Sequence, residues 1–281
     1  MTFGQLGLSP RRSRNASAVV TGAGSGIGAA FAVELGRRGG RVVCSDIDEL
    51  SAQRTADAVT DEGGAAVAVR CDVSSVDDVS RLAAQAQDWF GAAPTLVVNN
   101  AGVGSGGDPI GELSLDDWTW VLGINLWGVI YGCHVFTPIL RAAGYGGIIN
   151  VASAAAYGAA PNMAAYNVSK AGVLSLSETL AAELSGTGVS VTVLCPTFVK
   201  TKIVESGRIT EQSGNLAHTL MRWTGFSASR VAKSCLDTHD RGGLYCMPQP
   251  DARIGWGIKR FAPSSYTRGA GLLARIGNVN P

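Results

Sequence analysis

The sequence predicts a single α/β domain in which helices cover both faces of a parallel β-sheet. Short apolar runs alternate with helical stretches over residues 15–250, and a glycine-rich turn follows the first run. A chain of 281 residues, of which 46% are hydrophobic, can form one such domain with a large core. No continuous apolar run reaches the roughly 18 residues that a membrane-spanning helix requires.

The expected elements follow one another in a regular order. We expect strands over residues 17–20, 41–46, 65–70, 95–98, 147–152, 189–194 and 243–247. We expect helices over residues 29–35, 48–62, 114–142 and 163–184. Ser74 and Ser114 are each followed three residues later by an aspartate, which is typical of a helix N-terminus. The helix over 114–142 is long and apolar, so we expect much of it to be buried.

The turn after the first strand has the composition of a phosphate-binding loop. Residues 21–28 read Thr-Gly-Ala-Gly-Ser-Gly-Ile-Gly and lie between an apolar run and a predicted helix. Glycines let the backbone come close to a pyrophosphate, and the helix N-terminus stabilises its negative charge. The spacing Gly-x-x-x-Gly-x-Gly differs from the common Gly-x-Gly-x-x-Gly. A plain strand-to-helix turn is therefore the alternative interpretation.

Three residues are candidates for acid–base chemistry. Tyr166 and Lys170 are four positions apart in a predicted helix and share one of its faces. A phenol has a pKa of about 10, and a neighbouring ammonium favours the phenolate, so we expect Lys170 to lower the pKa of Tyr166. Ser153 follows the apolar run 147–152, which places it at the carboxyl end of a strand. A Tyr-x-x-x-Lys pair is common by chance, but its combination with Ser153 and the glycine loop is specific.

With these motifs, residues 15–250 resemble the short-chain dehydrogenase/reductase family, in its single-domain NAD(P)-binding subfamily. Further matching positions are Asp72-Val73, Asn99-Asn100-Ala101-Gly102, Asn125, Pro196-Thr197 and Thr201. The resemblance implies a Rossmann-like, doubly wound sheet of seven parallel strands in the order 3-2-1-4-5-6-7, with a substrate lid over about 200–226. The chain departs from the family at Thr197, where glycine is frequent, so the shape of the nicotinamide pocket stays open.

The resemblance also implies roles for the site residues. Tyr166 would exchange the proton of the substrate hydroxyl, and Lys170 would bind the nicotinamide ribose. Ser153 would orient the substrate oxygen, and Asn125 would bind a water of a proton relay. The alternatives are a strand-end cap for Ser153, a buried hydrogen-bonding residue for Asn125 and a core aromatic for Tyr166. The implied cofactor-binding residues are Gly22, Ser25, Gly26, Ile27, Gly28, Asp46, Ile47, Asp72, Val73, Asn99, Ala101, Gly102, Tyr166, Lys170, Pro196, Val199 and Thr201.

Asp46 predicts that the cofactor is NAD. It ends the second predicted strand, where a carboxylate can accept hydrogen bonds from the adenosine ribose and would repel a 2′-phosphate. Family members that use NADP usually carry Arg or Lys at the positions that Ser25 and Ile47 occupy here. A capping role for Asp46 at the next helix is the alternative.

The resemblance implies an NAD-dependent oxidoreductase that acts on the CH–OH group of a secondary alcohol, or on its ketone. Small residues between 153 and 166 and apolar side chains in the lid favour an apolar or bulky substrate, whether steroid-like, aromatic or acyl. Those lid side chains are Leu216, Leu220, Met221, Trp223 and Phe226. Lys200, Lys202 and Arg208 lie near the expected mouth and could meet an anionic group. The alternatives are an NADP-dependent ketoacyl or carbonyl reductase and a non-catalytic NAD-binding scaffold, which would generally lack the Tyr or Lys.

Both ends of the chain are basic and lie outside the resemblance. Residues 1–14 and 252–281 hold no acid, and all 22 acidic residues lie between them. We interpret residues 1–14 as a solvated extension. The tail, 251–281, interleaves aromatic and basic residues, which predicts packing on the domain or on a neighbouring subunit, with peripheral contact to an anionic membrane as the alternative. The acidic central region and the lack of a recognition motif argue against nucleic-acid binding.

The remaining composition bears on location and assembly. Six scattered cysteines predict reduced, buried thiols rather than a disulfide framework, and three isolated histidines predict no metal site. Residues 1–15 lack the apolar segment of a secretory signal, so we expect a cytoplasmic protein. Family members commonly pair the helices that correspond to 114–142 and 163–184. The resemblance therefore implies a homo-oligomer, a tetramer or a dimer.

Overall fold

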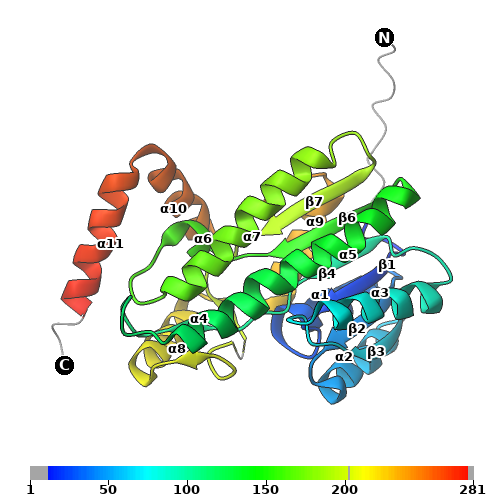
Figure 1. The fold of residues 1–281 in the computed structure, drawn as a ribbon, viewed down its shortest axis with the longest axis horizontal. Helices are drawn as coiled ribbons and strands as arrows, with labels where there is room; N and C mark the ends of the chain where they lie inside the picture. The colour runs from blue at the N-terminus through cyan, green and yellow to red at the C-terminus, as the bar shows by residue number, and fades with distance from the viewer. Residues whose placement is uncertain (1–11, 202, 278–281) are drawn as a thin grey trace, which may run out of the picture.

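The computed structural model describes residues 12–201 and 203–277, which form an α/β fold around a seven-stranded sheet (Figure 1). The strands are β1 (Ser17–Thr21), β2 (Arg41–Asp46), β3 (Ala65–Arg70), β4 (Leu96–Asn99), β6 (Gly146–Val151), β7 (Val189–Leu194) and β11 (Tyr245–Cys246). All pairs are parallel, and the order is β11-β7-β6-β4-β1-β2-β3. The predicted doubly wound, Rossmann-like fold is therefore confirmed, and the strand order reverses between β1 and β4.

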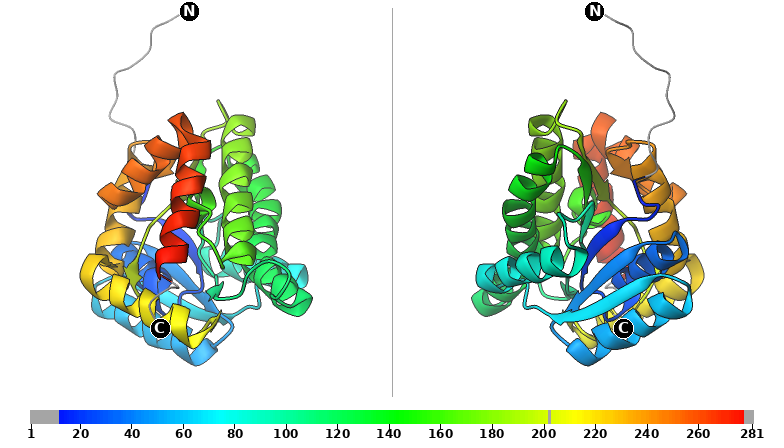
Figure 2. Two further views of the ribbon diagram at one scale, coloured as in Figure 1. Left: turned by 90° about the vertical axis from the view of Figure 1, so that its left-hand side faces the viewer. Right: turned by 90° about the vertical axis from the view of Figure 1, so that its right-hand side faces the viewer.

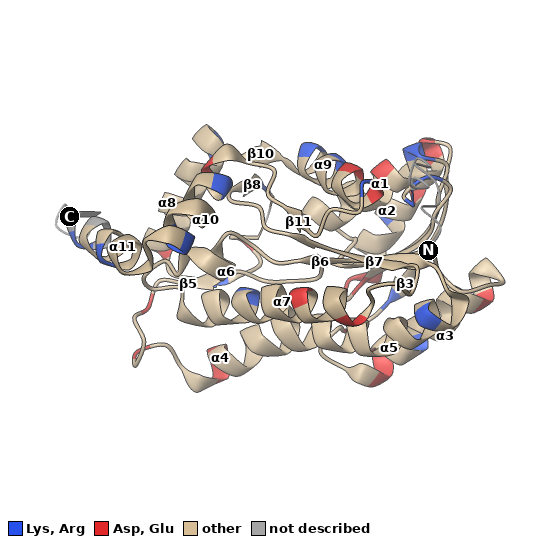
Figure 3. Ribbon diagram, turned by 90° about the horizontal axis from the view of Figure 1, so that it is seen from above, with Lys and Arg blue, Asp and Glu red and all other residues tan. Residues whose placement is uncertain are grey.

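Helices cover both faces of the sheet (Figure 3). One layer contains α1 (Gly26–Arg37), α2 (Glu49–Asp61) and α9 (Ala228–Asp240), and the other contains α3 (Val76–Phe90), α5 (Gly128–Ala143) and α7 (Ala164–Glu183). Strand residues alternate between two cores. Val19 packs in the core beneath α3, α5 and α7, whereas Ala18 and Val20 pack beneath α1, α2 and α9. This two-sided burial explains why the strands are apolar along their whole length.

Side-chain caps fix the start of two helices on the α5 side of the sheet. Ser114 caps α4 (Leu115–Leu122), as predicted, by accepting a hydrogen bond from the backbone N–H of Asp117. The cap expected at Ser74 is displaced by one residue, because Ser75 caps α3 by accepting from the N–H of Asp78. The Ser-x-x-Asp pattern occurs in both registers here, so spacing alone does not select between them.

The long apolar helix expected over 114–142 consists of α4, a π-helical turn η1 (Gly123–Trp127) and α5. In the described part of the chain, this continuous stretch, Leu115–Ala143, is the one helix long and apolar enough to span a membrane, although no such stretch was expected. A core helix of a globular domain has the same length and composition. Phe136 and Leu140 of α5 are fully buried in the domain core, which fits that second interpretation.

The segment expected to form the lid is tied to the domain at several points. β8 (Val199–Lys200) pairs with β10 (Phe226–Ser227), and β9 (Arg208–Ile209) pairs with β5 (Ser105–Gly106). α8 (Glu211–Thr224) lies between these strands in sequence. The Arg208 guanidinium donates to Asp117 Oδ1 over 2.6 Å and lies 4.3 Å from the centre of the Trp120 ring, so this basic residue is held by α4. Lys202 lies outside the described residues.

The described part of the basic N-terminal extension packs on the domain. Residues 1–11 lie outside the described residues. Ser13 is buried and contacts Asp240 of α9 twice, through its N–H over 2.8 Å and through its hydroxyl over 2.7 Å. Arg12 donates to the carbonyl of Gly188 over 3.2 Å. Arg12 and Ser13 therefore contact the domain, whereas Arg14 is exposed.

The C-terminal tail forms a helical hairpin of α10 (Pro250–Phe261) and α11 (Pro263–Gly277), seen at the left of Figure 1. The boundary predicted after residue 250 thus falls in the first turn of α10. Trp256 makes an edge-to-face contact with Tyr157, with 5.1 Å between the ring centres. The tail therefore packs on the body of its own domain through Trp256, whereas Phe261 is 90% exposed.

The cysteines and His239 lie inside the protein, whereas His134 and His218 are exposed. All six cysteines are free and buried, as predicted. His239 is buried beside the hydroxyls of Thr192 and Ser190, and burial lowers its pKa to about 4. Over residues 12–201 and 203–277, no group of three His, Cys, Asp or Glu side chains could hold a metal ion.

We expect the protein to form a dimer or tetramer through α4, α5 and α7. Leu115 lies on α4, Val168 lies on α7, and both have exposed side chains whose burial between two copies would stabilise an assembly by about 25 cal/mol per Å². Light scattering should give a dimer or tetramer mass, and Val168→Arg should lower it. Leu50→Arg, at an exposed leucine on α2, is the matched control. A monomeric wild-type protein would contradict this prediction.

Candidate functional site

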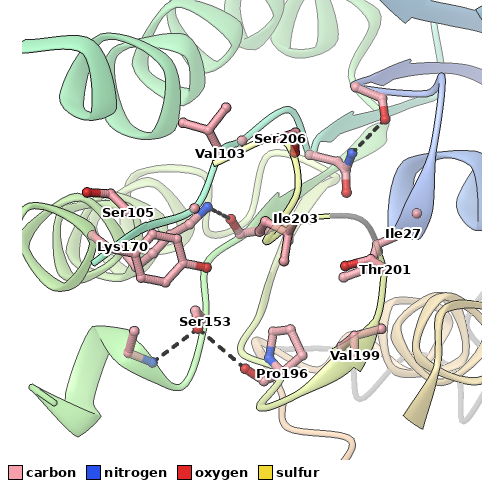
Figure 4. Close-up of a pocket in the computed structure, with 18 of the residues that line it drawn as sticks. Ile27, Val103, Ser105, Ser153, Lys170, Pro196, Val199, Thr201, Ile203 and Ser206 are labelled. Carbon is pink, nitrogen blue, oxygen red and sulfur yellow. Dashed lines mark hydrogen bonds between the residues drawn. The ribbon is translucent and has the colours of Figure 1, made fainter. Parts of the chain in front are cut away.

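A cavity of about 640 Å³ opens at the carboxyl edge of the sheet, around the point where the strand order reverses (Figure 4). Its walls come from the loops that follow β1, β2, β4, β6 and β7, together with α7, the lid segment and α11. In open α/β sheets, ligands bind at this edge and at this reversal. The cavity is therefore the candidate active site.

The glycine-rich loop forms one end of the cavity. Gly22 and Gly26 have φ angles of 63° and 56°, which side-chain-bearing residues rarely adopt. Ser25 is the N-cap residue of α1, and its side chain makes no capping bond to the first N–H groups of that helix. Gly28 does not line the cavity. A Cβ on this residue would lie 2.1 Å from the carbonyl oxygen of Gly22, so a larger residue would not fit here. Its role is to let α1 pack against the loop.

Asn100 joins the glycine loop to the loop after β4. Its Nδ2 donates to the carbonyl of Thr21 over 2.8 Å and to that of Gly22 over 3.2 Å. The Thr21 hydroxyl in turn accepts from the N–H groups of Asn100 and Ala101. The motif Asn99-Asn100-Ala101-Gly102 predicted cofactor contacts for this loop, but Asn99 rather than Asn100 was among the predicted cofactor-binding residues.

The assignment of Asn99 to the cofactor site needs correction. Its side chain is buried below the sheet edge and donates to Asn150 Oδ1 over 2.9 Å. Asn99 is absent from the cavity wall, whereas Asn100 is part of it. Asn99 is the last residue of β4, so the alternation of side chains along a strand turns it into the core and turns the next residue to the loop.

Asp46 faces the glycine loop from the end of β2. Its Oδ2 accepts from the N–H of Gly24 over 2.8 Å, and its Oδ1 accepts from the N–H of Asp48 over 3.0 Å. The N-cap of α2 is Asp48, not Asp46. Asp46 therefore fixes the loop conformation while its carboxylate lines the cavity.

Ser153, Tyr166 and Lys170 converge on the cavity from two elements. Figure 4 shows Ser153 and Lys170 in the cavity wall. α7 carries Tyr166 and Lys170 one turn apart, and the end of β6 brings in Ser153. The Lys170 ammonium is buried, donates to the carbonyl of Val151 over 3.0 Å and lies 5.8 Å from the centre of the Tyr166 ring. Ser153 Oγ accepts from the N–H of Ala155 over 3.1 Å and donates to the carbonyl of Pro196 over 3.5 Å.

Burial dominates the ionisation of this group. It raises the pKa of Tyr166, and the hydrogen bond to Ser153 opposes that change. It also lowers the pKa of Lys170 to about 8. The direction for Tyr166 is opposite to the one predicted from the sequence. The reason is that the ammonium is directed to the carbonyl of Val151, so desolvation of the phenol outweighs its attraction to Lys170.

Asn125 is fully buried in the π-helical turn η1. Its Oδ1 accepts from the N–H of Val103 over 2.8 Å, and its Nδ2 donates to the Val103 carbonyl over 2.9 Å. A Cβ on Gly102 would lie 3.1 Å from Asn125 Oδ1 and 3.3 Å from Lys170 Nζ. Asn125 thus holds the loop after β4 close to Lys170. This matches the alternative role of a buried hydrogen-bonding residue, and the water of the proton relay stays a prediction.

The other predicted cofactor residues all line the cavity: Gly22, Ser25, Gly26, Ile27, Asp46, Ile47, Asp72, Val73, Ala101, Gly102, Tyr166, Lys170, Pro196, Val199 and Thr201. In the lid, Met221 lines the cavity, whereas Leu216 and Trp223 are exposed. Sequence reasoning missed Tyr266 of α11. No motif marks that residue, and its contact to the cavity depends on how the hairpin folds back.

Thr197, where the family often has glycine, lines the cavity and bonds to the start of α10. Its N–H donates to Gln249 Oε1 over 3.3 Å, and its hydroxyl donates to Asp251 Oδ1 over 3.4 Å. Gln249 is itself buried and donates to the carbonyl of Phe198 over 3.0 Å. The loop after β7 is thereby fixed to the tail.

Comparison with known proteins agrees with this geometry. Residues 16–212 match the family model for short chain dehydrogenases. The chain is 41% identical over 264 residues to the probable oxidoreductase EphD of Mycobacterium tuberculosis. The aligned region covers 90% of this chain and 44% of EphD, so the chain spans less than half the length of that relative. It is 35% identical over 190 residues to the cyclohexanol dehydrogenase of an Acinetobacter species, covering 68% of this chain and 75% of the relative.

Solved structures give the same result. A short chain dehydrogenase/reductase from Burkholderia phymatum in complex with NAD is 34% identical, with a TM-score of 0.82, and covers 89% of this chain and 96% of its own. The apo form of LigD from a Sphingobium species is 26% identical, with a TM-score of 0.76, and covers 95% of this chain and 99% of its own. The family match, the sheet order and the convergence of Ser153, Tyr166 and Lys170 lead to one conclusion: the chain belongs to the short-chain dehydrogenase family.

Proposed function

We propose that this protein is an NAD-dependent oxidoreductase that transfers hydride between NAD(H) and a secondary alcohol or its ketone. The observation that carries the proposal is the convergence of Ser153, Tyr166 and Lys170 in the cavity that the glycine loop closes. Two relatives support an alcohol as the substrate by their names, the cyclohexanol dehydrogenase and the D-threitol dehydrogenase of Mycolicibacterium smegmatis. The related Burkholderia structure supports NAD as the cofactor.

The residues around the cavity fit a dinucleotide. The backbone at Gly22 and Gly26 has no side chain between it and the cavity, and the N-terminus of α1 favours negative charge there. The carboxylate of Asp46 suits ribose hydroxyls and disfavours a 2′-phosphate. Pro196, Val199 and Thr201 would hold the nicotinamide end. When bound, the cofactor supplies the hydride acceptor or donor.

The side chains of the protein would position the substrate and move its proton. Because Ser153 and Tyr166 line the same cavity, a substrate oxygen placed beside Ser153 would lie within reach of the phenol. Tyr166 Oη would take the hydroxyl proton during oxidation and return it during reduction. The buried Lys170 ammonium would bind the nicotinamide ribose and favour the phenolate electrostatically. Asn125 would hold the neighbouring loop and bind the water of the proton relay.

The lining of the cavity favours an apolar or bulky substrate. Small or apolar residues that follow Ser153, together with Met163 and Met221, form much of its wall. We further propose a cytoplasmic location, because reduced thiols such as the six buried cysteines are typical of reducing compartments. The NADP-dependent reductase and the non-catalytic scaffold remain the alternatives that the experiments below separate.

Tyr166→Phe should fold, bind NAD and lose at least about 100-fold in turnover, because the variant lacks the acid–base hydroxyl. Steady-state assays on a panel of secondary alcohols, with NAD affinity measured separately by titration, would test this. Tyr145→Phe removes an exposed tyrosine hydroxyl elsewhere on the molecule and is the control. Near-normal turnover in the Tyr166 variant would overturn the mechanism, and NAD binding without turnover in the wild type would favour the scaffold.

The wild-type enzyme should prefer NAD to NADP by at least about 10-fold in kcat/KM, which corresponds to about 1.4 kcal/mol. The preference should narrow in Asp46→Asn and in Asp46→Ala. Asn retains one carbonyl oxygen for the N–H of Gly24, whereas Ala leaves that loop contact unmade. If the preference for NAD is smaller in both variants, the cause is the loss of the negative charge rather than a change in the loop structure. Preference of the wild type for NADP would contradict the assignment of Asp46.

Lys170 should make stability depend on pH in the alkaline range. Its pKa falls from 10.5 in the unfolded chain to about 8 in the folded one. Between these values the unfolded chain binds more protons, so folding becomes more favourable as pH rises, and below pH 8 the cost of burying the ammonium is constant.

The difference in unfolding free energy between Lys170→Met and wild type should therefore fall by roughly 2–3 kcal/mol from pH 7.5 to 10.5. Urea unfolding of both proteins at several pH values measures this difference. The titration of all other groups contributes equally to both proteins and cancels in the subtraction. Lys233→Met, at an exposed lysine of α9, is the control and should show no such change. A pH-independent difference for Lys170→Met would show that the ammonium is not desolvated.

A further inference from the structure

The cavity continues past the catalytic residues to the C-terminal hairpin. Tyr266 of α11 lines the same cavity as Ser153 and Tyr166. Its hydroxyl lies beside Gly158, because a Cβ built on that glycine would be 3.7 Å from Tyr266 Oη. Gly158 ends the short helix α6 (Ala155–Gly158), which starts directly after Ser153. One short helix therefore connects the catalytic serine to the side chain from the tail.

The first helix of the hairpin is anchored to the cavity wall. Tyr157 of α6 is buried and donates its hydroxyl to the carbonyl of Ala252 over 3.0 Å. The Trp256 ring centre lies 5.1 Å from that of Tyr157 and 5.6 Å from that of Tyr245. Thr197, in the loop after β7, adds the hydrogen bond to Asp251. These contacts fix α10 to the same segments that form the cavity, so the position of α11 is set by the cavity wall.

α11 presents one face to the domain, and Tyr266 is its large side chain near the start. Residues 263–265, 267 and 268 of α11 are exposed, whereas Tyr266 and residues 269–271 are partly buried. Tyr266 and Ala270 are four positions apart and share one helix face. Lys259 of α10 lies 5.9 Å from the centre of the Tyr266 ring. Figure 1 shows α11, in red, on the outer side of α10, and in the left view of Figure 2 it lies in front of the domain. The Tyr266 ring thus forms part of the far wall of the cavity.

Small and apolar residues form the cavity wall along α6, the loop after it and α8. They are Ala155, Gly158, Ala160, Met163, Ala217 and Met221, and Lys259 beside the Tyr266 ring does not line the cavity. Between α6 and α7 the chain turns through Ala159 and Asn162, whose φ angles are 49° and 59°. Small floor residues opposite an aromatic ring suit an apolar ring or chain. Gly158, which lies beside the Tyr266 hydroxyl, is five residues past Ser153, so Tyr266 contacts the wall at the far end of α6.

We propose that Tyr266 and α6 form a distal apolar subsite that binds the part of the substrate remote from its carbinol carbon. The placement of the carbinol carbon beside Ser153 and Tyr166 rests on the proposed function. The substrate class that follows is a secondary alcohol or ketone with an apolar ring or chain beyond the ring or carbon that reacts. The hairpin is therefore part of the enzyme's substrate site, and Tyr266 is a specificity-determining residue.

A matched pair of alcohols tests the subsite: cyclohexanol, and 4-cyclohexylcyclohexanol, which adds one apolar ring to the same reacting ring. Tyr266→Ala should lower kcat/KM for the larger alcohol by at least about tenfold and change that for cyclohexanol by less than about twofold. Tyr266→Phe keeps the ring and should stay within about twofold of wild type on both. Phe261→Ala removes an aromatic residue from the same hairpin that is 90% exposed and is the control.

An equal loss on both alcohols would show a structural role for Tyr266, and no loss on either would show that the substrate does not reach it. Either result overturns the subsite, as does a Tyr266→Phe variant as impaired as Tyr266→Ala. Titration calorimetry of 4-cyclohexylcyclohexanol tests the subsite without turnover. Binding weakened at least tenfold in Tyr266→Ala supports it, and equal binding to both proteins, or none to wild type, overturns it. A protein that binds this alcohol but oxidises no alcohol with NAD or NADP overturns the proposed function alone.

Discussion

The side chain of Asn100 holds together the two loops between which the cavity opens, and the rest of the site depends on this contact. β1 and β4 are neighbours in the sheet, but their loops leave in different directions because the strand order reverses there. Asn100 bonds the carbonyls of Thr21 and Gly22, which would otherwise each lose a partner at a cost of about 1–3 kcal/mol when buried. Gly22 is thereby fixed in its left-handed conformation, and Gly28 can pack α1 against it.

The same constraint reaches the proposed catalytic side chains through the residues that follow Asn100. The loop continues through Gly102 to Val103, whose backbone N–H and carbonyl are both hydrogen-bonded to the side chain of Asn125. The π-helical turn widens the helix at that residue, and such turns are frequent at functional sites. Lys170 lies against the same loop, in an environment where burial rather than pairing sets its protonation. The loop after β4, which lies beside the glycine loop, therefore helps to set the position of Lys170.

Sequence patterns predicted the sheet because each strand is a short apolar run with turn residues at both ends, and β2, β3 and β7 have the bounds expected from the sequence. They predicted the glycine loop and the Ser153, Tyr166 and Lys170 group because spacing determines which side chains share a face or a strand end. They did not separate Asn99 from Asn100, since a shift of one residue reverses the direction of a strand side chain. The pKa of Tyr166 depends on burial by distant segments, and the contact of Tyr266 joins residues far apart in the chain, so neither follows from local spacing.

The walls of the cavity extend along the chain from Gly22 to Tyr266, and this order has a consequence for biosynthesis. Protein domains begin to form contacts while their C-terminal segments are still being translated. The strands up to β4 and the loops through Gly102 emerge first, but α1 packs against α9, so the half of the cavity around the glycine loop is complete only after α9 has been translated. The opposite wall can form only after α7 has been translated, and its far end only after α11 has been translated. Until the hairpin emerges, the nascent domain exposes the apolar surface around Tyr157 to the surrounding water and chaperones.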